Sequence, residues 1–396
     1  MKKKLLTSCE KSLILISSFI CFNISCQEKN NRDEETKVVT TQVISNEVSF
    51  LFMGDFMQHG PQIDAARDSN GNYNYDHYFE YTNSLINGVD FAIANLEVTL
   101  AGAPYRGYPR FCAPDEYALS IKKAGFDILT TANNHSNDRN SEGLIRTISL
   151  LDSFSITHLG TYVDSKERQK NYPLIIEKDK IKIALLNYTY GTNGLATKYP
   201  NIVNMIEQET IQKDIINAQK LKSDKIIVIT HWGSEYSSFP DSYQKKWGEW
   251  LLDNGAEIVI GGHPHWVQPI EYRKDSLNNE KLIVWSLGNI ISNQRREHTD
   301  GGSSLQFTFY RDSVGEVKLK DIGYHLHWVW LHTEDNQKKY QILPLSKLDQ
   351  MNLPMNEKSK KELNKFIQNE RTLYKENNIM VPEYQYNQKT DSYYLE

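Results

Sequence analysis

The sequence of 396 residues has few cysteines, no excess of positive charge and no apolar run long enough to cross a membrane comfortably. Its four cysteines are Cys9, Cys21, Cys26 and Cys112, and three of them lie in the N-terminal leader. So few thiols beyond the leader argue against a disulfide framework and against a structural zinc site built from clustered thiolates. The formal net charge of −5 offers no basic face for a phosphate backbone, so nucleic acid is not an expected partner.

The N-terminus has the features of an export signal. The basic leader MKKKLLTSCEK precedes the apolar run SLILISSFICFNIS at residues 12–25. This run is shorter than the roughly 20 residues of a membrane helix and fits the apolar part of a secretory signal. Cys26 follows the small residue Ser25 and resembles the lipidated cysteine of a bacterial lipoprotein signal, although Asn23 stands where leucine is usual. Ordinary secretion with cleavage nearby is the alternative.

We therefore expect an exported protein that a lipid anchor holds on the cell envelope, in the periplasm or at the cell surface. Residues 1–26 would be the signal, and the polar residues 27–46, which show no periodicity, would form a linker. A globular domain is expected over residues 47–330. A C-terminal extension with a charged amphipathic helix and a tail is expected over residues 331–396.

The domain is predicted to have an α/β fold. Six segments each begin with a short apolar run rich in Ile, Val, Leu and Phe, typical of a strand buried on both faces, and end in a polar cluster. They lie at residues 48–60, 89–100, 126–138, 225–236, 257–268 and 282–294. Amphipathic helical patterns occur at residues 115–125, 141–154 and 241–255. Strands that alternate with helices imply central sheets. Beyond about residue 302, apolar and polar residues alternate as in antiparallel strands.

Each apolar run ends in side chains that bind metals or handle protons. These residues are Asp55, Asn95, Glu97, Asn133, Asn134, His135, Asp138, His231, Glu235, His263, His265, Ser286 and Asn289. In such sheets the chemistry collects in loops beyond the carboxyl ends of the strands, so we expect these side chains to converge. Carboxylate and amide oxygens mixed with imidazoles suit divalent Mn, Fe or Zn, as one ion or a pair.

Six successive motifs resemble those of the capsule-synthesis, poly-γ-glutamate proteins of the CapA type (PGA_cap). In chain order they are GDFM, ANLE, TANNHSND with GLIRT, THWGSEY, GGHPHWVQ and WSLGNIISNQ. That family belongs to the calcineurin-like metallophosphoesterase superfamily. The resemblance implies a four-layer α-β-β-α sandwich with two divalent metal ions at one edge of the sheets.

The resemblance also implies a set of metal ligands. They would be Asp55, Glu97, Asn134, His231, His263 and His265. Glu97 would bridge the two ions, and the two histidines of the His-Pro-His motif would be divided between them. Metallophosphoesterases open with an Asp-x-His motif, whose histidine position is occupied here by Met57. His59 is too displaced to be taken as a substitute, so one metal would have fewer ligands.

The implied reaction is attack by metal-activated water on a phosphorus or carbonyl centre. His135 would protonate the leaving group. Asp138 would either orient His135 or place a negative charge at the N-terminus of the next helix. The sequence is compatible with either role for Asp138.

Four further polar residues would lie around the metals. Asn95, a neutral residue where an acid could stand, and Glu235 would support a ligand or face the substrate. Ser286 and Asn289 would either hydrogen-bond to the ligands or form a turn around Gly288.

The leading hypothesis is a lipid-anchored, metal-dependent hydrolase or transferase that acts in capsule or poly-γ-glutamate synthesis. Its substrate would be an anionic polymer or a phosphoester, and its partners would be other capsule-synthesis membrane proteins. One alternative is a non-catalytic assembly or export subunit of a capsular polymer machine, which Met57 and Asn95 favour. Another is an exported phosphatase or phosphodiesterase.

Overall fold

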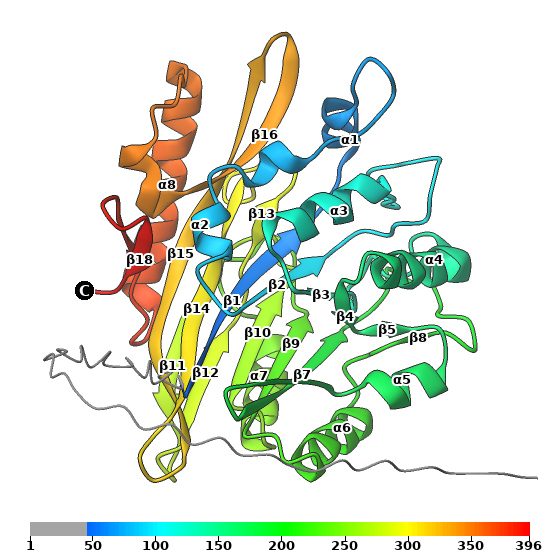
Figure 1. The fold of residues 1–396 in the computed structure, drawn as a ribbon, viewed down its shortest axis with the longest axis vertical. Helices are drawn as coiled ribbons and strands as arrows, with labels where there is room; N and C mark the ends of the chain where they lie inside the picture. Colours follow the sequence, from blue (N-terminus) through cyan, green and yellow to red (C-terminus); the bar gives the residue numbers. More distant parts are fainter. Residues whose placement is uncertain (1–45) are drawn as a thin grey trace, which may run out of the picture. The chain divides into compact units, whose positions relative to one another are not determined.

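The structure, a computed structural model, describes residues 46–396, which fold around two β-sheets (Figure 1). The predicted signal and nearly all of the predicted linker lie outside the described residues. Within residues 46–396, no helix is long and apolar enough to cross a membrane.

The first sheet has eight strands and combines parallel and antiparallel pairing. Its main order is β16-β15-β14-β1-β2-β3-β4, and β13 pairs with β1 off this path. The strands β1 to β4 run parallel, whereas β14, β15 and β16 are antiparallel to their neighbours. The strands are β1 Glu47–Phe56, β2 Phe91–Leu96, β3 Ile128–Thr130, β4 Thr157–Leu159, β13 Asn289–Ile291, β14 Gly301–Arg311, β15 Val317–Glu334 and β16 Gln337–Pro344.

The second sheet has six strands in the order β11-β12-β10-β9-β7-β6. Its four central strands are parallel, and the two edge strands are antiparallel to their neighbours. They are β6 Leu174–Lys178, β7 Ile181–Thr189, β9 Lys225–His231, β10 Ile258–Gly262, β11 Ile270–Lys274 and β12 Glu280–Val284. Two short pairs complete the strands: β5 Thr161–Tyr162 with β8 Ile202–Val203, and β17 Gln385–Asn387 with β18 Ser392–Tyr394.

The predicted helices at residues 115–125, 141–154 and 241–255 correspond to α3, α4 and α7, and the charged C-terminal helix is α8. α3 is capped at its C-terminal end by Gly125, whose φ of 109° is the left-handed conformation that favours glycine at a helix end. The helices are α1 Gly60–Ala66, η1 Asp76–Phe79, α2 Asn83–Ile86, α3 Asp115–Ala124, α4 Asn140–Ser153, α5 Ser165–Asn171, α6 Gln208–Lys220, α7 Ser242–Asp253, η2 Leu345–Gln350 and α8 Glu357–Asn377.

The alternation of side chains along β1 shows how the layers are built. Phe50 and Phe52 belong to the core shared with the second sheet, where they join residues such as Ile227 of β9. Leu51 and Met53 point the other way and pack in a separate core with residues of α3 and α4. Residues of α6 and α7 contribute to the core around the second sheet. The predicted α/β architecture of two sheets flanked by helices is thus confirmed (Figure 1).

The C-terminal part is built into this architecture. The predicted boundary after residue 330 falls inside β15, and β16 continues the same sheet, because the alternating apolar pattern runs on through residue 330. α8 is tied to β14 by the Tyr374 hydroxyl, which lies 2.7 Å from Oγ of Ser303. The segment after α8 also pairs with the sheet, since the Tyr384 N–H donates to the Tyr324 carbonyl at 2.8 Å.

Two buried histidines lie side by side on one face of β15. Nε2 of His327 is 2.8 Å from Oγ of Ser304, and Nε2 of His325 is 3.0 Å from Oε1 of Gln306. Burial lowers the pKa of His327 to about 3, because the charged imidazolium would lose its hydration. These contacts give both residues a structural role.

We expect His327 to make the fold sensitive to acid. Between the ordinary pKa of 6.5 and about 3, the unfolded chain takes up a proton that the folded chain excludes. Stability is therefore unaffected above the ordinary pKa and falls as the pH drops through this window, by at most about 1.4 kcal/mol per pH unit for one group. His327→Gln keeps a hydrogen-bonding partner for Ser304 and should flatten this dependence in urea denaturation with EDTA present. Equal pH slopes for the variant and wild type would contradict the prediction.

Candidate metal centre

The predicted ligands come from the carboxyl ends of strands in both sheets. Asp55 lies near the end of β1, Glu97 directly follows β2, and His231 is the last residue of β9. The loop after β10 supplies His263 and His265. The six predicted ligands are all at most 3% exposed: Asp55, Glu97, Asn134, His231, His263 and His265. The fold therefore gathers into one buried place residues that are far apart in the sequence.

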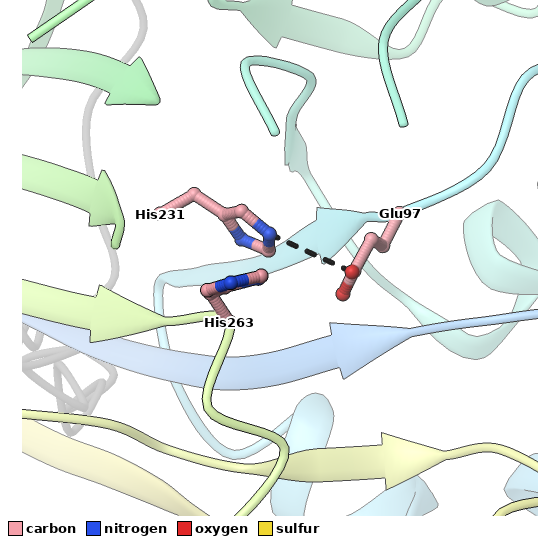
Figure 2. A group of neighbouring side chains, drawn as sticks. All are labelled: Glu97, His231 and His263. Atoms are coloured by element: carbon pink, nitrogen blue, oxygen red, sulfur yellow. Dashed lines mark ion pairs between the residues drawn. The ribbon is translucent and has the colours of Figure 1, made fainter. Parts of the chain in front are cut away.

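Glu97, His231 and His263 form one group of ligand atoms that all lie within 4.8 Å of one another (Figure 2). Nε2 of His231 is 3.5 Å from Oε1 of Glu97. The same nitrogen is 3.0 Å from Oδ1 of Asn134. An imidazole, a carboxylate and an amide oxygen thus lie close together. The ring centroid of His263 is 4.7 Å from that of His231.

Asp55, Glu97 and His265 form a second group with the same spacing limit of 4.8 Å. Nδ1 of His265 is 3.5 Å from Oδ2 of Asp55. Glu97 belongs to both groups, so its carboxylate lies where a ligand shared by two ions would lie. The two histidines of the His-Pro-His motif fall into different groups, with ring centroids 6.0 Å apart.

The turn after β10 directs these two histidines. His263 has φ 98° and His265 has φ 59°, a left-handed region that residues other than glycine seldom adopt and that is concentrated at functional sites. The backbone also passes close to Asp55, because the His263 N–H donates to Oδ2 of Asp55 at 3.2 Å. A Cβ on Gly262 would lie only 2.8 Å from Oδ1 of Asp55, so glycine is needed for this approach.

The electrostatics of the pocket fit a divalent cation. Both carboxylate oxygens of Glu97, Nδ1 of His263 and Nδ1 of His265 are buried without a hydrogen-bond partner among the described residues. Burial and the charges of Asp55 and Glu235 raise the pKa of Glu97 well above its usual range. Burial alone would also raise the pKa of Asp55, but its contact with His265 and the charge of His231 bring it below its usual value. Burial of unpaired carboxylates is costly, and a bound cation would remove that cost.

Two histidines of the site, His231 and His263, are held in the neutral form. Burial lowers the pKa of His231 to about 3. Burial and the neighbouring imidazoles lower the pKa of His263 well below its usual value. Neutral imidazoles with carboxylates and an amide oxygen are a donor set for Mn, Fe or Zn.

His135 lies beside the two groups and belongs to neither. Its Nδ1 is 2.7 Å from Oδ2 of Asp138, and the same oxygen accepts a hydrogen bond from the N–H of Phe111 at 2.6 Å. The ring of Phe111 packs at 89° to His135, with centroids 4.6 Å apart. Of the two roles considered for Asp138, these contacts match the orientation of His135, since α4 begins at Asn140 with Arg139 as its N-cap.

Asn95 stands between ligands of the two groups. Its Nδ2 donates to Oδ1 of Asp55 at 2.8 Å and is 3.3 Å from Nδ1 of His231. Asn133 holds Asn95 in turn, because Nδ2 of Asn133 donates to Oδ1 of Asn95 at 3.1 Å. Asn95 is therefore placed to orient ligands.

Three other predicted residues are not brought into the ligand groups. Oγ of Ser286 donates to the carbonyl of Trp266 at 2.7 Å, so it fastens the loop that follows the two histidines. Nδ2 of Asn289 donates to the carbonyl of Thr299 at 3.0 Å, which ties β13 to the loop before β14. Glu235 is exposed and lines the cavity next to the site.

A cavity of about 560 Å³ opens beside the two ligand groups and is lined by His135, Asp138 and His265. Met57 and His59 also line it, yet neither belongs to a ligand group. Nδ1 of His59 is instead 3.3 Å from Oε1 of Gln62, and burial lowers the pKa of His59 to about 4. His59 therefore does not replace the histidine that the opening motif lacks.

Other residues of this cavity were not predicted from the sequence, among them Tyr108, Arg110, Asn193 and Arg296. They come from loops that carry no strand or helix periodicity. A signal was present for Arg110 in the segment PYRGYPRFCAP, where basic, aromatic and proline residues interrupt the regular pattern. No comparable signal marks Asn193.

Comparison with known proteins confirms the family resemblance. The profile of the family described as "Bacterial capsule synthesis protein PGA_cap" matches residues 49–294. The "Capsule biosynthesis protein CapA" of Bacillus anthracis is 27% identical over 249 residues, which are 59% of this chain and 58% of the relative. The "PGA biosynthesis protein CapA" of Bacillus subtilis strain 168 is 25% identical over 289 residues, which are 70% of this chain and 72% of the relative. The match thus spans less than two thirds of the first of these relatives.

Among solved structures, the NAD nucleotidase of Haemophilus influenzae aligns with a TM-score of 0.45 and 16% sequence identity. The alignment covers 83% of this chain and 60% of that chain.

Proposed function

Because the chain belongs to the bacterial capsule synthesis protein family PGA_cap, we propose that it is a metal-dependent hydrolase or transferase that acts on a capsular polymer such as poly-γ-glutamate. The observation that carries this proposal is the pair of buried ligand groups that share Glu97. A purely structural core would not leave both oxygens of a buried glutamate without partners.

The two groups would hold two divalent ions, Mn, Fe or Zn, with Glu97 between them. Such ions act as Lewis acids and lower the pKa of water to about 7. Two residues of the chain, His135 and Asp138, would assist the departure of the leaving group. His135 lines the cavity and would donate a proton to it, and Asp138 fixes the orientation of that ring through Nδ1 at 2.7 Å.

The location of the protein is part of the proposal. The leader and Cys26 support export and a lipid anchor on the cell envelope. Other capsule-synthesis membrane proteins would be its partners there, and the substrate would be an anionic polymer or a phosphoester.

Turnover that depends on metal is the expected result for the purified protein. With added Mn, we expect hydrolysis of bis-p-nitrophenyl phosphate or cleavage of poly-γ-glutamate, loss of that activity in EDTA and recovery when metal is restored. Metal at about 100 times its Kd should also stabilise the fold by about 2.7 kcal/mol, measured as a shift in thermal unfolding. Absence of both turnover and stabilisation with Mn, Fe and Zn would refute metal binding as well as catalysis.

A metal-binding assembly subunit without catalysis is the second candidate, and Met57 favours it. This residue stands at the missing histidine position and is buried. In this case the metal would raise the unfolding temperature, and neither substrate would be cleaved. The two readouts therefore separate the second candidate from the first.

A further inference from the structure

The cavity beside the metal centre carries two arginines that the proposed chemistry does not use, Arg110 and Arg296. Nε of Arg110 donates to the carbonyl of Asp138 at 2.7 Å, and its Nη2 donates to Oδ1 of Asn140 at 3.1 Å. These acceptors are neutral, so they orient the guanidinium without compensating its charge. Cζ of Arg296 lies 4.8 Å from the ring centre of Tyr236, which is also an uncharged neighbour.

We propose that Arg110 and Arg296 form an anion-binding subsite, which binds a carboxylate or phosphate group next to the group that reacts. This inference rests on the proposed function and names the substrate class of the same site. No ion pair found among residues 46–396 involves either arginine, in contrast to pairs such as Arg146 with Asp115. Guanidinium groups bind carboxylate and phosphate through paired hydrogen bonds, and a guanidinium held in place loses less freedom when it does so.

Among the described residues, the two acidic residues of the cavity, Asp138 and Glu235, form no ion pair with Arg110 or Arg296. Asp138 already accepts from the N–H of Phe111 and contacts His135. Glu235 is exposed, lines the same cavity and would repel an anion. Neutralising Glu235 should therefore strengthen anion binding, whereas neutralising Arg296 should weaken it. The two substitutions should therefore change the affinity for an anion in opposite directions.

The position of Arg296 favours a chain-like ligand over a small ester. This residue lines a second cavity as well, of about 390 Å³, which is bounded by residues of α8. The second cavity carries both signs of charge, with Lys358 and Glu362 among its residues. An anionic group held at Arg296 thus has open space on both sides, which suits one repeat of a polymer.

The test is equilibrium binding to the full chain in EDTA, so that metal and turnover play no part. One arm titrates a short γ-linked glutamate oligomer, and the other titrates inorganic triphosphate. Arg296→Gln is expected to weaken binding by about tenfold or more and to reduce its salt dependence, because an exposed charge that contacts the ligand is removed. Glu235→Gln is expected to tighten binding. Arg67→Gln, an exposed arginine outside both cavities, serves as the matched control and should bind like wild type.

Failure of the subsite and failure of the proposed catalysis give different results in this test. Dependence on Arg296 in the oligomer arm assigns the group as a carboxylate, dependence in the triphosphate arm assigns it as a phosphate, and either supports the subsite. The subsite is overturned if wild type binds neither probe, or if Arg296→Gln binds both as Arg67→Gln does. Binding that depends on Arg296 in a protein without turnover would leave the subsite in place while catalysis fails. Turnover without any effect of Arg296→Gln on binding would support the proposed catalysis and overturn the subsite.

Discussion

Replacement of Glu97 by glutamine is expected to lower metal affinity by more than about 100-fold, because loss even of the partners behind metal ligands costs about 10–100-fold. Glu97 is the residue common to both ligand groups, so its loss weakens both positions at once. Glutamine keeps the shape of the side chain and removes its charge. The measurement is metal content per chain after desalting, together with the metal-dependent rate.

The same substitution should have the opposite effect on the metal-free fold. Burial and the charge of Asp55 raise the pKa of Glu97 well above 4.5, so near neutral pH the folded chain bears a cost that the unfolded chain does not. This cost is absent below the ordinary pKa and grows as the pH rises above it. In EDTA at neutral pH, Glu97→Gln should therefore unfold at a higher temperature than wild type, and the two should converge toward pH 4.5.

A partly buried glutamate outside the site provides the control for this experiment. Glu257 is half-buried, and its Oε2 accepts a hydrogen bond from the Ile226 N–H at 2.7 Å. Glu257→Gln should leave the metal content unchanged. A Glu97→Gln protein that carries as much metal as wild type would show that Glu97 is not a ligand.

His135→Ala is expected to lower kcat/KM by about 10²–10⁴-fold, the usual contribution of a general acid, while the bound metal is retained. The reason is that His135 lines the cavity and lies outside both ligand groups. The loss should be largest for alkoxide leaving groups and smallest for p-nitrophenolate, which needs little protonation. A series of phosphodiesters with different leaving groups measures this directly as a steeper dependence on leaving-group pKa.

Asp138→Asn should give a smaller loss than His135→Ala, because the ring remains while its partner at 2.7 Å is neutralised. His158→Ala is the matched control, since this histidine pairs with Asp152 and does not line the cavity. Loss of metal in His135→Ala would show that His135 is a ligand and would contradict its assignment as the acid.

The convergence of the candidate ligands could be predicted from the sequence because it follows from general rules for parallel sheets. Asp55, Glu97 and His231 each end an apolar run, and parallel strands bring their carboxyl ends to one edge. The shared position of Glu97 and the division of His263 from His265 came from the family resemblance. Periodicity alone does not contain that detail.

What could not be predicted depends on pairing between distant segments. Arg110 and Arg296 come from irregular loops, and their common cavity follows only from the packing of the finished fold. The boundary expected after residue 330 failed to mark a structural break for a similar reason. A C-terminal strand joins an existing sheet only if the edge strand of that sheet accepts it. Here β15 pairs with β14 along most of its length and thereby extends the first sheet past residue 330.

The position of β14 limits how the protein can be divided. The family profile ends at residue 294, and β14, which pairs with β1 from Glu47 to Met53, begins only at Gly301. A chain cut at the end of the profile would leave one side of β1 open along most of its length, on the strand that carries Asp55. An uncovered strand edge is a template for aggregation. We therefore expect the smallest part that folds to extend beyond the family region, because an expression boundary at residue 294 would cut through the sheet that supports the candidate metal centre.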